Sequence, residues 1–426
     1  MKQPLDLMFD PWLKAESADL SAIVEQITGM VLQAPLKGTA KRQRQPKADQ
    51  VDRVRAVVSA IIANLVRYHI GSHKGERLAI PAGHPKAASR YELKGFNQLR
   101  PIVTIMAENG LAFVSPAFKD RRMGLEADGW LLKALHEAPI KPKDLGRATG
   151  EEVLWLSARM GRNEFGQKLP QEHINYADTQ ETLKLRKEVE EINDFLNTQD
   201  ITLDGEPQGT IRLTRRFLLR SPSAPHEFKL HGRLYGGCWQ NLKRERRDGL
   251  RINGEPIADL DFASMFPRLA YAKVGVEPPD GDLYAVPGLE NHRAGVKAGF
   301  SALLSVSSDM KKLPSEVKEA LPEGWPASRF KAAIGEKHPA LVPLFGKDTG
   351  SDLMFTESRI LLSVLRGLMQ KGVPALPMHD GIMVAEPDEA IARAAMRASS
   401  IQVTGRQLEV VRKGWGYPPT ATPPEL

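Results

Sequence analysis

The sequence predicts an α+β fold, because short apolar runs typical of strands alternate with longer segments that carry apolar residues at helical spacing. The run 257–262 ends near Asp261 and leads into a helix that begins close to Pro267. The run 373–384 has the pattern of two short strands joined by a tight turn that contains Asp380. Both carboxylates are therefore expected at the ends of rigid strands.

The composition bounds the class of protein. At 426 residues the chain can hold two or three domains, and 42% hydrophobic residues are enough for ordinary cores. The longest apolar stretch, near 57–66, is interrupted by Ser59 and Asn64 and is too short for a membrane span. The first residues also lack the apolar core of a signal peptide. We therefore expect a soluble protein with no membrane partner.

Cysteine content and charge add two further expectations. The single cysteine, Cys238, excludes an internal disulfide framework and a cysteine-based zinc site, which fits a reducing cytoplasmic location. The net charge of +7 and the pI near 9.3 favour a polyanionic partner. Charge alone does not identify that partner, because many basic proteins bind no nucleic acid.

The N-terminal part of the chain divides into two predicted segments. Residues 1–50 have the pattern of a short helix and a basic arm, with the basic run at 41–47. Residues 51–145 form a helical module in which 51–68 is a core helix, because its apolar residues share one face. Within it, a helix over 96–109 precedes a hairpin, which is the outline of a winged helix and also of many plain α+β modules.

Two more segments follow. Residues 146–208 are expected to be helical and charged, with an apolar stripe from Leu183 to Leu196. A basic strand over 210–219 opens the last segment, 209–426, which carries the residues with chemical potential.

Asp261 and Asp380 suggest a metal site. Carboxylate oxygens are the ligands that Mg²⁺ prefers, and a pair of such ions can activate an attacking oxygen while stabilising a leaving one. A carboxylate beside a strand is more often only a solvated edge, so the two aspartates gain weight from the residues around them.

Two other groups of residues point to phosphate chemistry. The stretch 231–242 is rich in glycine and offers Arg233, Gln240 and Asn241 as donors to phosphates, sugars or minor-groove acceptors. Arg293 and Lys297 lie four residues apart, so they project from one face of a helix and can grip a triphosphate. Such a pair is otherwise commonly only surface.

Taken in order, these motifs resemble the polymerase domain of family A DNA polymerases, over roughly 209–418. His-Gly-Arg-Leu at 231–234, followed by Gln240 and Asn241, is similar to the family's primer-template segment. Asp-Phe-Ala-Ser at 261–264 is similar to motif A, and Arg293 with Lys297 is similar to motif B on the fingers helix. His379-Asp380 is similar to motif C.

The resemblance implies a right-hand architecture, with palm and fingers in 209–426, fingers at about 282–345, and a thumb-like region in 146–208. It implies template-directed DNA synthesis in replication or repair, with a DNA primer-template and dNTPs as partners. Two Mg²⁺ ions, with Mn²⁺ as an alternative, would be held by Asp261, Asp380 and the backbone carbonyl of Phe262. No carboxylate cluster of a proofreading exonuclease precedes residue 209.

The resemblance also implies roles at the incoming nucleotide. Lys297 would neutralise the departing pyrophosphate and Arg293 would bind the γ-phosphate. His379 would orient the primer end, although packing of the hairpin is an equal interpretation. Phe300 is expected near the nascent base pair. Glu357 is expected either to reach the template or to serve as a first-turn partner of a helix dipole.

The sequence departs from the family at three places. Gly381 stands where family A has a glutamate, a loss shared with the phage single-subunit RNA polymerases. The aromatic ring of motif B falls on Phe300, one position early, with Ser301 at the expected place. Phe266 replaces a glutamate in motif A, as in family B, and its ring would collide with a ribose 2′-hydroxyl, which favours deoxynucleotides.

Three other functions compete with primer extension. One is a primer-independent RNA polymerase or primase on the same palm. Another is a DNA-binding replication initiator in which the palm is a vestige, although a dead palm has no use for the clustered charges. A two-metal nuclease would need more acidic ligands near Asp261 than the sequence offers.

Overall fold

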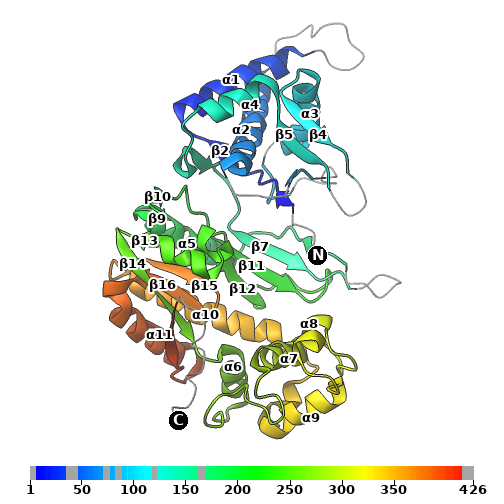
Figure 1. The fold of residues 1–426 in the computed structure, drawn as a ribbon, viewed down its shortest axis with the longest axis vertical. Coiled ribbons are helices and arrows are strands. Elements are labelled where there is room, and N and C mark those ends of the chain that lie inside the picture. The colour runs from blue at the N-terminus through cyan, green and yellow to red at the C-terminus, as the bar shows by residue number, and fades with distance from the viewer. Residues whose placement is uncertain are drawn as a thin grey trace, which may run out of the picture. The chain divides into compact units, whose positions relative to one another are not determined.

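The computed structural model describes residues 6–34, 47–70, 77–81, 89–93, 95–117, 122–161 and 169–414. Helices and strands are mixed along the chain, so the predicted α+β class is confirmed (Figure 1). Among the described residues, no helix is both long enough and apolar enough to cross a membrane. The chain divides into two compact units, which we call the first unit (1–152 and 205–212) and the second unit (153–204 and 213–426).

The first unit packs four helices against short strands. Its helices are α1 (Ala18–Gln33), α2 (Ala48–Ile70), α3 (Leu99–Glu108) and α4 (Gly129–Glu137). Its strands are β1 (Leu7–Met8), β2 (Leu13–Ala15), β3 (Leu78–Ala79), β4 (Ala112–Ser115), β5 (Gly124–Ala127), β6 (Leu145–Arg147) and β10 (Glu206–Pro207). One sheet has the order β1-β3-β5-β4, and β2 pairs with β6.

Helix α2 forms the centre of this unit, because Val57, Val58, Ile61 and Ile62 are fully buried in its core. The predicted core helix is thus confirmed. The predicted helix and hairpin are present as α3, β4 and β5, with β4 and β5 antiparallel. The predicted basic run at 41–47 falls largely outside the described residues.

The second unit has two sheets and most of the remaining helices. Its first sheet has the order β12-β11-β7-β8 and comprises β7 (Leu154–Ala158), β8 (Glu172–His173), β11 (Thr214–Leu219) and β12 (His231–Tyr235). The other sheet contains β9 (Ile201–Leu203), β13 (Leu250–Ile252), β14 (Glu255–Phe262), β15 (Ala375–Met378), β16 (Gly381–Ala385) and β17 (Val410–Lys413). Strand β14 is central, since β16 pairs along it and β13 and β17 pair with its two ends.

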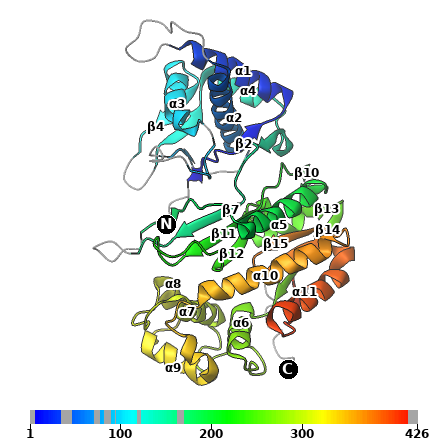
Figure 2. The ribbon, with the colours of Figure 1, turned by 180° about the vertical axis from the view of Figure 1, so that it is seen from behind.

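The helices of the second unit are α5 (Gln180–Asn197), α6 (Met265–Val274), α7 (Arg293–Ser305), α8 (Ser315–Ala320), α9 (Ala327–Lys337), α10 (Gly350–Met369) and α11 (Glu389–Thr404). Helix α10 contacts β12, β15, α5, α6, α7 and α11, and Figure 2 shows α10 and α11 side by side. Helix α10 therefore connects both sheets of the second unit with its other helices.

One expectation for this unit is wrong. Residues 146–208 were expected to be helical, but Leu154–Ala158 forms β7, which pairs in parallel with β11. Leu154, Leu156 and Ala158 are fully buried. A short, almost continuous apolar run gains more from pairing inside a covered parallel sheet than from a helix, which would have no polar face for solvent. Only α5 retains the predicted helical stripe.

Candidate active site

Asp261 and Asp380 are brought together by the pairing of β14 with the β15–β16 hairpin. In this antiparallel ladder Asp261 lies opposite Gly381, the residue after Asp380. The backbone N–H of Phe262 donates a hydrogen bond to the carbonyl oxygen of Asp380 at 3.2 Å. The apolar residues of both strands fix this register, because a slip by one residue would turn the buried faces outward.

The carboxyl group of Asp261 is buried beside other charges. Asp261 is only 7% exposed. Burial, reinforced by the negative charge of Asp380, raises the pKa of the Asp261 carboxyl to about 7. Lys413, on β17, forms an ion pair with Oδ2 of Asp261 and opposes this shift. Oδ1 is buried and has no hydrogen-bond partner among the described residues. An unpaired buried carboxylate oxygen is costly unless a cation or donor satisfies it.

Asp259 is a third carboxylate of the site, which the sequence analysis did not select. It lies two residues before Asp261 on the same face of β14 and opposite Lys413 in the β14–β17 ladder. Asp259 is 2% exposed, and burial raises its pKa. Its Oδ2 has no hydrogen bond and lies 3.8 Å from Arg247. The alternation Asp-x-Asp in a predicted strand was the signal that could have found it.

His379 occupies an unusual backbone conformation at the tip of the hairpin. Its φ of 55° lies in the left-handed region, which non-glycine residues rarely adopt. Its ring lies 5.1 Å from the ring of Tyr235, and its Nδ1 is buried without a partner among the described residues. Burial, aided by the positive charge of Arg233, lowers the pKa of His379 to about 4. The imidazole is therefore neutral at neutral pH and can position groups but does not carry a charge.

Arg233 is held by Glu357. Its Nε and Nη2 donate to the two carboxylate oxygens at 2.6 and 2.9 Å, and Glu357 is 1% exposed. Burial acts to raise the pKa of Glu357, whereas Arg233 lowers it. The bidentate geometry is that of an ion pair, so we assign both groups as charged. The guanidinium also lies 5.9 Å from the ring centre of Phe266.

The ion pair depends on close packing of β12 against α10. A Cβ atom on Gly232 would lie 2.7 Å from Oγ of Ser358, and the φ of Gly232 is 73°. Glycine is therefore required beside Arg233 for both space and backbone conformation. Glu357 lies in the interior of α10 and binds a side chain, so it is not the first-turn dipole partner considered from the sequence.

Gln240 is committed to the backbone. Its Oε1 accepts from the N–H groups of Gly236 and Gly237, and its Nε2 donates to the carbonyl oxygens of Leu234 and Pro377. It thus ties β12 to the hairpin that carries Asp380. Arg233 and Gln240 are thus both engaged within the protein. Asn241, the third expected nucleic-acid contact, is exposed, and its side chain has no hydrogen bond in the described part of the chain.

The predicted triphosphate residues lie on α7, as expected from their spacing. Arg293 forms a bidentate ion pair with Asp282, at 2.6 and 3.0 Å. Lys297 is exposed and has no recorded partner among the described residues. Phe300 is 0% exposed and lies between Tyr284 and His338 in the core. The expectation that Phe300 contacts a nucleotide is therefore wrong, because its ring presents no surface.

The donor set fits a divalent cation in part. Asp261 provides a buried oxygen without a partner, and Asp380 is half-exposed beside it. Within the described ranges, however, no group of three or more histidine, cysteine, aspartate or glutamate side chains is arranged to enclose a metal. A cation bound here would therefore need ligands from outside this group of side chains, such as water or a substrate.

The sequence matches no family model and no curated protein. Among solved structures, the chain is similar to the POL domain of Pol1 from M. smegmatis, determined in complex with DNA primer-template and dNTP. The two share 12% sequence identity and a TM-score of 0.30, over 60% of this chain and 58% of that one. A TM-score of this size does not establish a common fold, so the function depends on the residues of the site.

Proposed function

We propose that this chain catalyses template-directed nucleotidyl transfer and extends a primer 3′ end with dNTPs. The observation that carries the proposal is the meeting of Asp261, on β14, with Asp380, in the turn of the β15–β16 hairpin, while one buried oxygen of Asp261 has no partner among the described residues. The carboxylate of Asp261, buried beside the negative charge of Asp380, is costly unless a cation lies close to it. In this assignment β14 and the β15–β16 hairpin belong to the palm, and residues 282–345 form the fingers.

The two carboxylates would act together as metal ligands in the proposed reaction. Asp261, Asp380 and the backbone carbonyl of Phe262 would hold two Mg²⁺ ions, or Mn²⁺ in their place. When bound, such a pair would activate the primer 3′-hydroxyl and stabilise the leaving oxygen. Neutral His379 would accept or donate one hydrogen bond to the primer end. The chain's own contribution is to fix these groups on a rigid sheet.

The residues of α7 would bind the triphosphate. Lys297 is exposed and unpaired in the described structure, so its ammonium group is free to neutralise charge on the departing pyrophosphate. Arg293 would bind the γ-phosphate, but it must exchange Asp282 for the ligand. Asn241, which is exposed, would contact the primer-template. Arg233, whose guanidinium lies near the ring of Phe266, would contact it as well.

Phe266 would select the sugar. Its half-buried ring lies on α6, four residues after Phe262, and is held near Arg233. A bulky ring next to the sugar would exclude a 2′-hydroxyl, so we propose dNTPs as substrates. The alternative, an RNA polymerase or primase, predicts incorporation of NTPs without a primer.

A primer-extension assay with Asp380→Asn tests the proposal. We expect loss of extension on a DNA template with Mg²⁺ or Mn²⁺, while primer-template binding changes little, because only the metal ligand is altered. Asp194→Asn is the matched control, since Asp194 is an exposed aspartate on α5. Extension by Asp380→Asn at the wild-type rate would overturn the mechanism.

The same assay separates the alternatives. Labelled dNTPs and NTPs are offered with and without a primer, on DNA and on RNA templates. Incorporation of dNTPs only with a primer supports the proposal. NTP incorporation without a primer supports a primase, and specific DNA binding without any incorporation supports an initiator.

A further inference from the structure

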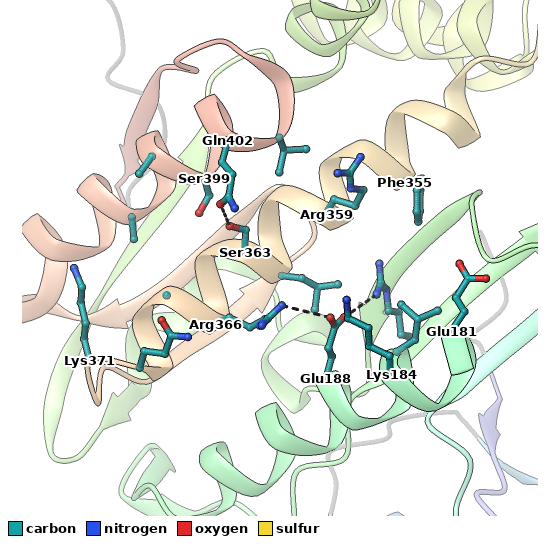
Figure 3. A pocket seen from close by; sticks show the side chains of 18 residues that line it. Glu181, Lys184, Glu188, Phe355, Arg359, Ser363, Arg366, Lys371, Ser399 and Gln402 are labelled. Carbon is teal, nitrogen blue, oxygen red and sulfur yellow. Dashed lines mark hydrogen bonds and ion pairs between the residues drawn. The ribbon is translucent and has the colours of Figure 1, made fainter. Parts of the chain in front are cut away.

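A groove of about 750 Å³ lies in the second unit between α5, α10 and α11 (Figure 3). Its walls carry the cationic residues Lys184, Arg215, Arg359, Arg366 and Lys371, and only two acidic residues, Glu181 and Glu188. None of these residues belongs to the candidate active site. The groove therefore has an excess of positive charge that the proposed reaction does not use.

The excess is concentrated around Glu188. Arg215 and Arg366 approach its two carboxylate oxygens at 3.7 and 3.4 Å, so one anion serves two guanidinium groups. Arg359, exposed on α10, has no recorded partner among the described residues and repels Arg215. Two arginines thus share a single carboxylate, and a third lies nearby without a counter-ion in the described structure.

Arg215 makes this arrangement costly. It is 2% exposed and donates a hydrogen bond from Nε to the carbonyl oxygen of Gly232 at 3.0 Å. Burial lowers its pKa to about 10, and Arg359 acts in the same direction. Glu188 neutralises Arg215 only in part, because it lies 3.7 Å away and also pairs with Arg366. A further anion in the groove would lower the cost of holding these cations together.

The cations are spread along the groove. Arg359, Ser363, Arg366 and Gln370 follow the i, i+4, i+7, i+11 spacing of one face of α10. At 1.5 Å per residue, this face extends for about 16 Å from Arg359 to Gln370. Lys184 on α5 lies on the facing wall. The two cations of this face, Arg359 and Arg366, are seven residues apart, which is about 10 Å along the helix. Cations that converge on one point suit a compact anion, whereas cations separated in this way suit successive phosphates of a chain.

We propose that this groove binds the phosphodiester backbone of a single strand of nucleic acid. The spread cations contact successive phosphates, while the side-chain amide of Gln370 donates a hydrogen bond to a phosphate or sugar oxygen; the hydroxyl of Ser363 instead donates to Gln402 on α11. The small residues Gly367, Ala395 and Ala398 leave room for the backbone on the wall between them. The inference rests on the proposed function only in taking that strand as an unpaired part of the template.

The test measures binding of a fluorescein-labelled oligothymidylate of about 12 nucleotides by fluorescence anisotropy, as a function of salt. The double variant Lys184→Gln/Arg359→Gln removes two exposed cations that have no recorded partner in the described structure. The slope of log K against log salt is negative, and for single strands each lost phosphate contact reduces its magnitude by about 0.7. We therefore expect the slope of the double variant to be shallower by about 1.4. The dissociation constant should rise by roughly tenfold at low salt.

The control is Lys187→Gln/Lys229→Gln, which removes the same charge from exposed lysines that do not line the groove. Its salt slope should stay within half the change seen for the groove variant. Thermal unfolding of both double variants establishes that they are folded. If the groove variant fails to fold, Lys184→Gln alone, with an expected slope change of about 0.7, replaces it.

Two outcomes would overturn the inference. One is an unchanged slope and affinity in the groove variant. The other is displacement of the oligothymidylate by inorganic pyrophosphate at equal phosphate concentration, which would assign the groove to a compact anion. The readout is binding, so the test is independent of the polymerase proposal. If the wild type extends a primer but the groove variant binds oligothymidylate normally, only the groove proposal is rejected. If the groove variant binds more weakly but the wild type extends no primer, only the polymerase assignment is rejected.

Discussion

Gly381 faces Asp261 so closely that a Cβ atom on the glycine would lie 2.9 Å from Oδ1 of Asp261 and 2.4 Å from the carbonyl oxygen of Leu260. The glycine that departs from the family A motif is therefore a steric requirement of this site. A glutamate at this position would displace either β16 or the Asp261 carboxylate. The close approach of the two strands therefore leaves no room for a carboxylate at position 381.

Gly381→Ala should weaken both stability and primer extension. The added methyl group meets backbone, which cannot move without disturbing the ladder, so we expect a loss of about 1–3 kcal/mol of unfolding free energy. Urea unfolding measures this loss. Gly367→Ala on α10 is the control, because nothing lies within 4 Å of its added Cβ and alanine favours a helix. Equal stability of the two variants would show that the approach of β14 and β16 is looser than described.

Binding of Mg²⁺ should depend on pH with a midpoint near 7. The pKa of Asp261 in the metal-free protein is raised to about 7, so below that pH the carboxyl carries a proton that the cation must displace. Affinity should rise by up to about tenfold per pH unit below the midpoint and level off above it. Calorimetric titration in buffers of different ionisation enthalpy measures both the affinity and the proton released. A flat profile between about pH 5 and 8 would contradict the assignment.

The same shift predicts how stability changes with pH. The folded-state pKa lies above the ordinary value of 3.8, so the folded protein binds more protons than the unfolded chain between these two values. The contribution of Asp261 to stability is therefore fully present below about pH 4 and is lost as pH rises through about 7. Asp261→Asn should remove this contribution to the pH dependence, as measured by urea unfolding of the metal-free protein.

Lys413 and Asp259 should move the metal-binding midpoint in opposite directions. Lys413 lowers the pKa of Asp261 and Asp259 raises it. Lys413→Met should therefore shift the midpoint upward, and Asp259→Asn should shift it downward. The readout is the pH profile of Mn²⁺ affinity.

Arg412→Met is the matched control for Lys413→Met. Arg412 is the next residue on β17, but it pairs with Glu386 and Glu389. Its loss should leave the midpoint unchanged. A shift of the same size in Arg412→Met would mean that net charge, and not the contact of Lys413 with Asp261, sets the pKa.

Arg233→Met should destabilise the second unit by about 3–5 kcal/mol, because it leaves Glu357 buried without its cation. The double variant Arg233→Met/Glu357→Leu should recover much of that stability, since it removes both charges. Chemical unfolding of the wild type, both single variants and the double variant gives the coupling energy. Additive losses would show that the two residues do not act as a buried pair.

The sequence alone determined the strands that carry the two carboxylates. Apolar runs of strand length end at Asp261 and at the Asp380 turn, and helical spacing placed Arg293 and Lys297 on one face. Local patterns of this kind depend on neighbours within a few residues, so they can be read without the fold. The failure at Leu154–Ala158 has the same basis, because its strand is stabilised by β11, which lies far along the chain.

Only the tertiary structure decided which groups meet. The pairing of β17 with β14 brings Lys413 to Asp261, the packing of β12 on α10 gives Arg233 its partner Glu357, and the burial of α7 removes Phe300 from the surface. Each of these results depends on the register and packing of elements distant in sequence. The energy of a buried charge is set by such neighbours, which no local pattern records.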